Sequence, residues 1–360
     1  MREGVKLRNL FRILIFTAAL LVISFYIYSP EETGPIKDDT YSLPPKHDND
    51  EAIPHITMTD SDKQPAEGLG SLIGRPQAEL IEGFGEPDRK EPSSYEYEWW
   101  IYNNELDSYM QVGIQDSKVV TIYAVGSQLN ITPFKIDQPV EDIYRSTVLE
   151  TEIVVNAHEG NYRFELTEED LNIRPLIQLG DIFAQLSIDK FTGTLFSVRF
   201  LDQKTLISQR PYELIYSGDL IDMEDPDEDK WEAIERGSEQ QIFDLTNTFR
   251  TRFDIPELKW DDEIAEVAYG HSKDMRENDY FAHDSPTFGD LAKRLKEGKV
   301  SFQTAGENIA ADYIDGPAAM EGWVNSENHR KALLDEDFTL IGVGVFKKNY
   351  TQNFVKHSEM

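Results

Sequence analysis

Any chemistry in this chain must be carried by histidine, carboxylate and hydroxyl side chains, because the sequence contains no cysteine. The missing thiols exclude disulfides, thiolate nucleophiles, Cys-x-x-Cys redox sites and cysteine-ligated zinc. His283 falls in YFAHDSP, where Ser285 and Pro286 force a turn, and His329 falls in the first turn of a predicted helix, in NSENHR. Glu307 follows a glycine in AGENIA, so we expect it to leave a tight turn with its carboxylate directed inward. Such groups act as general acids and bases or as metal ligands, and no GxSxG or HExxH pattern accompanies them.

Residues 237–360, which contain His283, Glu307 and His329, show an α/β pattern of predicted helices and strands. One helix places apolar residues on a single face, at Ile242, Leu245, Phe249 and Phe253. A second helix begins after a cap at Asp261 or Asp262, and it contains His271, which we interpret as a helix-face or core histidine. The segments 340–346 and 349–356 read as strands, and 318–335 reads as a helix, a break and a second helix with Ser326 as its N-cap.

A β-rich α+β domain is predicted over residues 69–217. A short helix closing at 83–85 precedes three alternating strands, and a similar order of helix and strands recurs after residue 136, which suggests a weak internal duplication. Trp99 and Trp100 are adjacent, so in a strand they point to opposite faces. We expect both to be core residues, and the alternative is that they line a binding groove.

The N-terminus predicts a membrane anchor. Four basic residues precede an uncharged run at 13–28, which with its apolar flank is about long enough to cross a bilayer. The run ends in bulky residues without a small-x-small cleavage site, so we interpret 1–28 as a basic tail and a signal-anchor helix, with a cleaved signal peptide as the alternative. The charge asymmetry places the remainder outside the cell. Residues 29–68 lack hydrophobic periodicity and are expected to form a disordered tether.

Charge limits the partners. The chain carries 35 Lys+Arg against 67 Asp+Glu, a formal charge of −32. A field of that sign repels phosphate backbones, so nucleic-acid binding is excluded. Residues 218–236 are expected to be a solvated acidic linker between the two external domains. The predicted location is the plasma membrane, with a single pass and both domains extracellular.

The motifs of the C-terminal part resemble a known family. The motifs LKWDDEIAEVA, AHDSP, GENIA, NSENHR, IGVGV and YTQNF occur in this order, and the match covers residues 239–356. Together they resemble the CAP superfamily (cysteine-rich secretory proteins, antigen 5 and pathogenesis-related proteins), in its bacterial, cysteine-free form. Residues 69–217 resemble the CAP-associated N-terminal region of membrane-anchored proteins from Gram-positive bacteria. The resemblance implies a three-layer α-β-α sandwich for the C-terminal domain.

The resemblance also implies a cleft lined by two histidines and two acidic residues. Matched motif by motif, the histidines fall on His283 and His329, and the first carboxylate falls on Glu307. The position of the second carboxylate, three residues after the helix tryptophan, is Ser326 here, with Glu327 next to it. Either Glu327 substitutes for the missing carboxylate, or the cleft has three members.

Two imidazoles and a carboxylate could hold a divalent metal such as zinc, with His283 and His329 as ligands and Glu307 as a third ligand or as a group that orients them. The alternative is a hydrogen-bonded cluster that only shapes the cleft.

We therefore carry three hypotheses. The first is a non-catalytic module that binds a cell-envelope ligand, which could be a peptide, a glycan, a lipid or an envelope protein. The second is a metal-dependent peptidase or cell-wall hydrolase that uses His283, Glu307 and His329. The third treats the cluster as scaffold. We favour the first, because the cleft holds no established nucleophile.

Overall fold

The computed structural model describes residues 47–48, 64–157, 160–221, 223 and 225–357. No helix formed by these residues has the length and apolarity needed to cross a bilayer. The predicted signal-anchor at 1–28 lies outside the described residues, as does most of the predicted tether at 29–68. Within the tether, β1 (His47–Asp48) pairs with a strand of the following domain.

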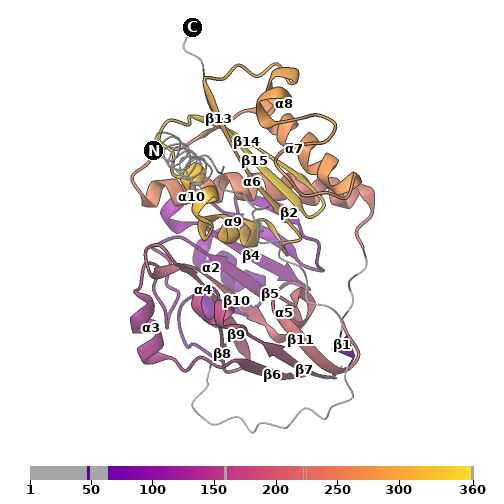
Figure 1. Ribbon diagram of the computed structural model, residues 1–360. Helices are drawn as coiled ribbons and strands as arrows, with labels where there is room; N and C mark the ends of the chain where they lie inside the picture. Colours follow the sequence, from indigo (N-terminus) through magenta and orange to yellow (C-terminus); the bar gives the residue numbers. More distant parts are fainter. Residues whose placement is uncertain (1–46, 49–63, 158–159, 222, 224, 358–360) are drawn as a thin grey trace, which may run out of the picture. The chain divides into compact units, whose positions relative to one another are not determined.

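The N-terminal domain is built on a seven-stranded sheet with the order β2-β3-β4-β5-β10-β9-β8, all antiparallel (Figure 1). Its strands are β2 (Arg89–Pro92), β3 (Glu98–Tyr102), β4 (Met110–Gln115), β5 (Lys118–Ala124), β8 (Leu176–Leu179), β9 (Ile182–Asp189) and β10 (Thr194–Asp202). A second sheet has the order β1-β11-β7-β6, with β6 (Glu152–Asn156), β7 (Gly160–Glu165) and β11 (Glu213–Gly218). The helical segments are η1 (Leu69–Leu72), α2 (Gln77–Phe84), η2 (Leu106–Ser108), α3 (Val140–Ser146), α4 (Glu168–Ile173) and α5 (Gln203–Gln209).

This domain is β-rich, as predicted. Helix α2 ends at Phe84, and Gly85 follows it with a φ of 81°, the conformation that glycine adopts most readily. Trp99 and Trp100 are both buried and belong to different core clusters, as expected of adjacent strand residues. The strands after residue 150 divide between the two sheets, so the two halves of the domain are not simple copies of each other.

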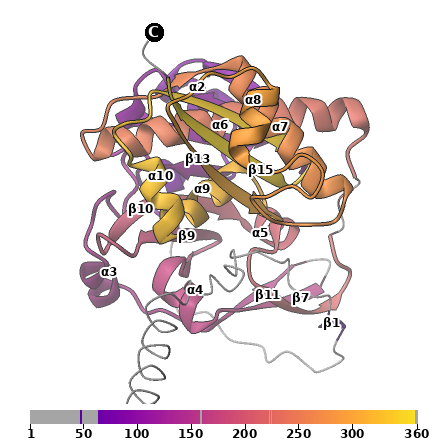
Figure 2. The same ribbon diagram turned by 45° about the horizontal axis from the view of Figure 1, so that its top comes forward.

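The C-terminal domain has a four-stranded sheet with helices on both faces. The sheet order is β12-β14-β15-β13, from β12 (Lys259–Trp260), β13 (Thr304–Ala311), β14 (Leu340–Phe346) and β15 (Asn349–Lys356). The helices are α6 (Glu228–Arg252), α7 (Asp262–Glu277), α8 (Leu291–Glu297), α9 (Gly316–Val324) and α10 (Glu327–Leu333). Helices α7 and α8 pack on one face, as Figure 2 shows, while α6 and α9 bury their apolar residues against the other. This mixed α/β domain follows the β-rich domain in the predicted order.

Close packing of α7 explains the glycines of the IGVGV motif. A Cβ atom built on Gly342 would lie 2.1 Å from the backbone nitrogen of Ala265, and one on Gly344 would lie 1.8 Å from that of Tyr269. No side chain larger than hydrogen fits between the strand and the helix. The motif therefore fixes the distance between α7 and β14.

The prediction that Glu307 leaves a tight turn is wrong. Glu307 lies within β13, where it is paired with Asn353 of β15. The preceding Gly306 serves packing instead, because a Cβ there would lie 2.9 Å from the ring of Phe338. Gly306 is needed because the Phe338 ring packs closely against the strand, and the sequence alone does not distinguish such a glycine from one required by a turn.

The acidic linker predicted at 218–236 is partly helical. Helix α6 begins at Glu228, and the side chain of Asp227 accepts a hydrogen bond from the Lys230 amide as its N-cap. Glu228 and Asp229 lie in the first turn, where carboxylates are stabilised by the helix dipole. Ile234 is buried within the same stretch. Asp227, Glu228 and Asp229 therefore start a helix, where a solvated hinge was expected.

The two domains belong to one compact unit and share a hydrophobic core. Trp99, Tyr123 and Phe196 of the seven-stranded sheet belong to the same buried cluster as Phe249 of α6 and Trp323 of α9. The face of the sheet that carries Trp99 is therefore covered by the C-terminal domain, and this excludes Trp99 from an open binding groove.

Candidate functional site

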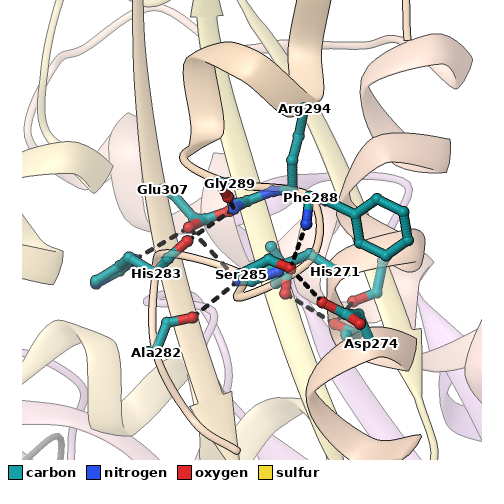
Figure 3. A network of polar contacts seen from close by, with 12 residues as sticks. His271, Asp274, Ala282, His283, Ser285, Phe288, Gly289, Arg294 and Glu307 are labelled. Atoms are coloured by element: carbon teal, nitrogen blue, oxygen red, sulfur yellow. Dashed lines mark hydrogen bonds and ion pairs between the residues drawn. The ribbon is translucent and has the colours of Figure 1, made fainter. Parts of the chain in front are cut away.

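Glu307 is the centre of the candidate site. Its Oε1 atom lies 3.1 Å from Nδ1 of His283, and its Oε2 atom accepts a hydrogen bond from Nη2 of Arg294 (Figure 3). His271 lies behind this pair, with Nε2 3.9 Å from Oε1. Only 4% of the Glu307 side chain is exposed, whereas 42% of the His283 side chain is exposed. The carboxylate is thus buried beneath an accessible imidazole.

The partners of Glu307 keep it ionised. Burial by itself raises the pKa of this carboxyl group, but the hydrogen bond with His283 and the charges of Arg294 and His271 outweigh it, so the pKa lies below its ordinary value. Because a carboxylate only accepts hydrogen bonds, this contact assigns a proton to Nδ1 of His283.

Arg294 ties Glu307 to the loop that carries His283. Its Nη1 atom donates to the carbonyl oxygens of His283 (2.7 Å) and Gly289 (2.8 Å), while Nη2 binds Glu307. The residue is buried on α8, whose N-cap Asp290 accepts from the amide of Lys293. A planar guanidinium with several fixed donors suits this role. We did not predict Arg294 as part of the site, because a lone arginine in LAKRLKEG looks like a solvated helix residue.

Ser285 shapes the His283 loop. Its hydroxyl donates to Oδ2 of Asp274 (2.6 Å) and accepts from the amides of Thr287 (3.1 Å) and Phe288 (2.8 Å), as Figure 3 shows in part. This is the turn role predicted for the HDSP segment. With its hydroxyl engaged in this way, Ser285 is not arranged as a nucleophile.

His271 is a buried core histidine, in agreement with our interpretation. Its Nε2 atom donates to the carbonyl oxygen of Ala282 (3.1 Å), and the side chain is inaccessible to solvent. Burial lowers its pKa, and the charge of Arg294 lowers it further, against the opposing charge of Glu307. His271 therefore supports the loop from beneath and does not line its surface.

His329 is electrostatically coupled to His283. It lies in α10, and its carbonyl oxygen accepts a hydrogen bond from Nδ2 of Asn308 on β13 (3.2 Å). Burial and, secondly, the charge of His283 lower the pKa of His329 to about 4. The structure thus places His329 beside β13, the strand that carries Glu307.

Ser326 and Glu327 do not supply a second acidic group. Ser326 is the N-cap residue of α10, but its side chain makes no capping hydrogen bond. The Glu327 side chain is 71% exposed and forms an ion pair with Lys331 at 2.8 Å, one turn along α10. The hydrogen bond with Lys331 lowers the pKa of Glu327. Glu327 is therefore a surface residue, and the structure does not bring it to Glu307.

The donor set does not fit a three-ligand metal site. Within the described part of the chain, no three histidine or carboxylate side chains converge as they would around a metal ion. Both oxygens of Glu307 are engaged, one by His283 and the other by the cationic Arg294. Glu307 therefore orients His283 and is not arranged as a ligand.

The lowered pKa of His329 predicts a pH dependence of stability. An unfolded histidine binds a proton below about pH 6.5, whereas native His329 stays neutral down to about pH 4. The unfolded state thus binds more protons in this window, so the contribution of His329 to stability falls as the pH drops through it. We expect a loss of at most about 3 kcal/mol between pH 7 and pH 4.

Glu239 and Glu321, whose pKa values burial raises to about 7, act in the opposite direction, so the wild type must be compared with His329→Gln. Urea unfolding at pH 7 and pH 4.5 should show a steeper loss for the wild type. Equal losses for both proteins would contradict the burial of a neutral imidazole at position 329.

Comparison with known proteins identifies both domains. A family model described as CAP-associated N-terminal matches residues 73–212, and the cysteine-rich secretory protein family matches residues 243–357. The uncharacterized membrane protein YlbC of Bacillus subtilis is 46% identical over 320 residues, which are 88% of this chain and 92% of YlbC.

Two crystal structures resemble the fold over most of its length. An extracellular protein containing an SCP domain from Bacillus anthracis is 47% identical, with a TM-score of 0.77, over 85% of this chain and 100% of that one. A cysteine-rich secretory protein from Staphylococcus aureus is 27% identical, with a TM-score of 0.74, over 82% of this chain and 95% of that one. Both similarities extend across the two domains.

Proposed function

Because the chain belongs to the cysteine-rich secretory protein family, in its cysteine-free form with a CAP-associated N-terminal domain, we propose that it is an envelope-exposed binding protein. Its C-terminal domain binds an envelope ligand at the surface formed by His283 and His329. A single-pass helix at the N-terminus holds it to the plasma membrane.

The location is supported by the sequence and by the relatives. The uncharged run at 13–28 follows a basic tail, which orients such a segment with the following domains outside. One relative is described as a membrane protein and another as an extracellular protein. A chain anchored at one end, with its remaining domains outside, satisfies both descriptions.

The observation that carries binding is the fixed, accessible imidazole of His283. Glu307 and Arg294 together hold its ring and its backbone, so the ring does not have to be ordered when a ligand arrives. An exposed imidazole held in this way can form a hydrogen bond with a ligand hydroxyl, amide or amine. Such donors are abundant in the glycan and peptide parts of a cell wall, and we therefore favour peptidoglycan as the ligand class.

Hydrolysis is less well supported by the same geometry. Glu307 has a lowered pKa and is ion-paired, so it is a poor general base. Ser285 is committed to Asp274 and to its own turn. The described residues thus present a rigid recognition surface without an activated nucleophile.

Two substitutions at His283 separate ligand binding from loop structure. An asparagine side chain at this position would place its amide nitrogen near the position of Nδ1, so His283→Asn keeps the hydrogen bond to Glu307 and removes Nε2. His283→Gln places its amide nearer to Nε2 and loses the bond to Glu307. We expect His283→Asn to weaken sedimentation of the full-length chain with purified peptidoglycan by about tenfold while its stability is retained.

The matched control is His357→Gln, which removes an exposed histidine after β15 that is no part of the Glu307 cluster. Binding should be unchanged in this variant. Equal binding by wild type and His283→Asn would overturn the proposal. Release of soluble muropeptides by the wild type, abolished in His283→Asn, would favour the hydrolase instead.

A further inference from the structure

The segment that joins α9 to α10, just before His329, is held by the other domain. The side chain of Asn325 accepts a hydrogen bond from the amide of Lys190 (2.9 Å) and donates one to the carbonyl oxygen of Ile188 (2.8 Å). Both partners lie at the end of β9 in the CAP-associated domain. Asn325 is buried, so these two bonds are shielded from water.

Arg330, the residue after His329, makes the second contact. Its Nη2 atom donates to Oδ2 of Asp189 (2.9 Å), and both side chains are buried. Its guanidinium also lies 4.9 Å from the ring centre of Phe191 and 5.0 Å from that of Phe249. A buried ion pair with aromatic rings around the cation therefore joins α10 to the turn between β9 and β10.

The turn between β9 and β10 is held by hydrogen bonds of its own. The other oxygen of Asp189, Oδ1, accepts from the amides of Phe191 (2.9 Å) and Thr192 (3.3 Å), and Gly193 closes the turn with a φ of 68°. One carboxylate thus fixes the turn with one oxygen and reaches across the domain boundary with the other. A turn held in this way can fix the position of the helix that it contacts, here α10.

Helix α10 is poorly suited to hold its own position. It has seven residues, fewer than an isolated helix needs for stability in water, and its N-cap Ser326 makes no side-chain capping bond. Its placement must therefore come from tertiary contacts. His329 lies between Asn325 and Arg330, the two residues that the CAP-associated domain contacts.

We propose that the CAP-associated domain positions the cleft: the β9–β10 turn, through Asp189 and Phe191, sets the place of α10 and of the His329 that this helix carries. Docking of the two domains then controls the position of one side of the binding surface. This inference depends on the proposed function only for the assignment of His283 and His329 to the binding surface.

The test is the substitution Asp189→Asn in the full-length chain in detergent. Asparagine keeps an oxygen for the amides of Phe191 and Thr192, but places an NH2 group against the guanidinium of Arg330. We expect amide hydrogen exchange across 327–333 to accelerate about tenfold or more, with carbethoxylation of His329 rising in parallel. Exchange in α7 should stay unchanged, because α7 packs on the opposite face of the sheet.

A second variant tests the same contact without changing Asp189, whose side chain also holds the turn itself. Phe191 is 45% exposed, so Phe191→Ala leaves the core of its own domain intact and removes one ring beside Arg330. Exchange in α10 should then rise about threefold. The matched control is Asp181→Asn, an exposed aspartate at the opposite end of β9, which should change nothing.

Two results would overturn the proposal. One is unchanged exchange in α10 of Asp189→Asn, and the other is an equal rise in α7 and α10, which reports a loss of overall stability. Exchange is measured without ligand, so a failure of peptidoglycan binding would refute the proposed function and leave this result standing.

Discussion

Replacing Arg294 by methionine is expected to destabilise the protein by about 3–5 kcal/mol, because it leaves the buried carboxylate of Glu307 without its cationic partner. Methionine fills a similar volume and cannot donate hydrogen bonds, so the carbonyl oxygens of His283 and Gly289 lose their donors as well. The free energy of unfolding can be measured by urea titration with tryptophan fluorescence at pH 7.

The double variant Arg294→Met/Glu307→Gln tests the cause. If an unpaired buried charge produces the loss, then removing the charge as well should recover part of the stability, and the double variant should be more stable than Arg294→Met alone. The exposed pair between Arg145 and Asp142 provides the matched control, since Arg145→Met should cost less than about 1 kcal/mol. A loss below about 1 kcal/mol for Arg294→Met would contradict the role of Arg294 as the partner that neutralises buried Glu307.

The elements that depend on local sequence were predictable. Strands β14 and β15 have the bounds expected from 340–346 and 349–356, and α7 begins after Asp261, one of the two predicted cap positions. Strand alternation, helical periodicity and caps are properties of neighbouring residues. The family motifs indicated His283, His329 and Glu307 as cleft residues, and in the structure Glu307 contacts His283.

The parts that depend on distant residues were not predictable. Glu307 was placed after a turn, because Gly306 reads as a turn signal unless the Phe338 ring beside it is known. Arg294 gains its role only when α8 is folded over the His283 loop. Glu327 was a plausible substitute for the missing carboxylate, but its position on α10 points it to solvent and to Lys331.

The interface between the two domains was also not predictable from the sequence. In the strand TLFSVRFLD, Ser197 and Arg199 alternate with apolar residues, which reads as a solvent-exposed face. In the structure this face is buried, with Ser197 bound to Glu321 and Arg199 bound to Asp315. Alternating polar residues on this strand therefore mark a polar interface with the C-terminal domain, and the sequence pattern alone does not distinguish such an interface from a solvent-exposed face.

Arg199→Met is expected to lower the free energy of unfolding by about 3–5 kcal/mol, again because a buried carboxylate would lose its partner. Arg199 donates from Nη1 and Nη2 to the two oxygens of Asp315, at 2.6 and 2.8 Å. It also lies 5.4 Å from the ring centre of Tyr123. This pair joins β10 of the CAP-associated domain to the N-cap of α9.

The same substitution should change how the protein unfolds. In the wild type, the shared core and this ion pair couple the domains, so calorimetry should show a single cooperative transition. With Arg199→Met we expect a weaker coupling, seen as a broadened or divided transition, in addition to the lower stability.

Asp315 also accepts a hydrogen bond from the amide of Ala318 at the start of α9 (3.0 Å), so its partner variant must preserve the cap. Asp315→Asn does so, since asparagine caps helices about as well as aspartate. If the loss in Arg199→Met arises from an unpaired charge, then Arg199→Met/Asp315→Asn should recover stability, because it removes that charge while keeping α9 capped. A double variant less stable than Arg199→Met would instead show that packing of the arginine side chain against Tyr123 and Trp99 dominates the interface, and that the ion pair serves only to orient it.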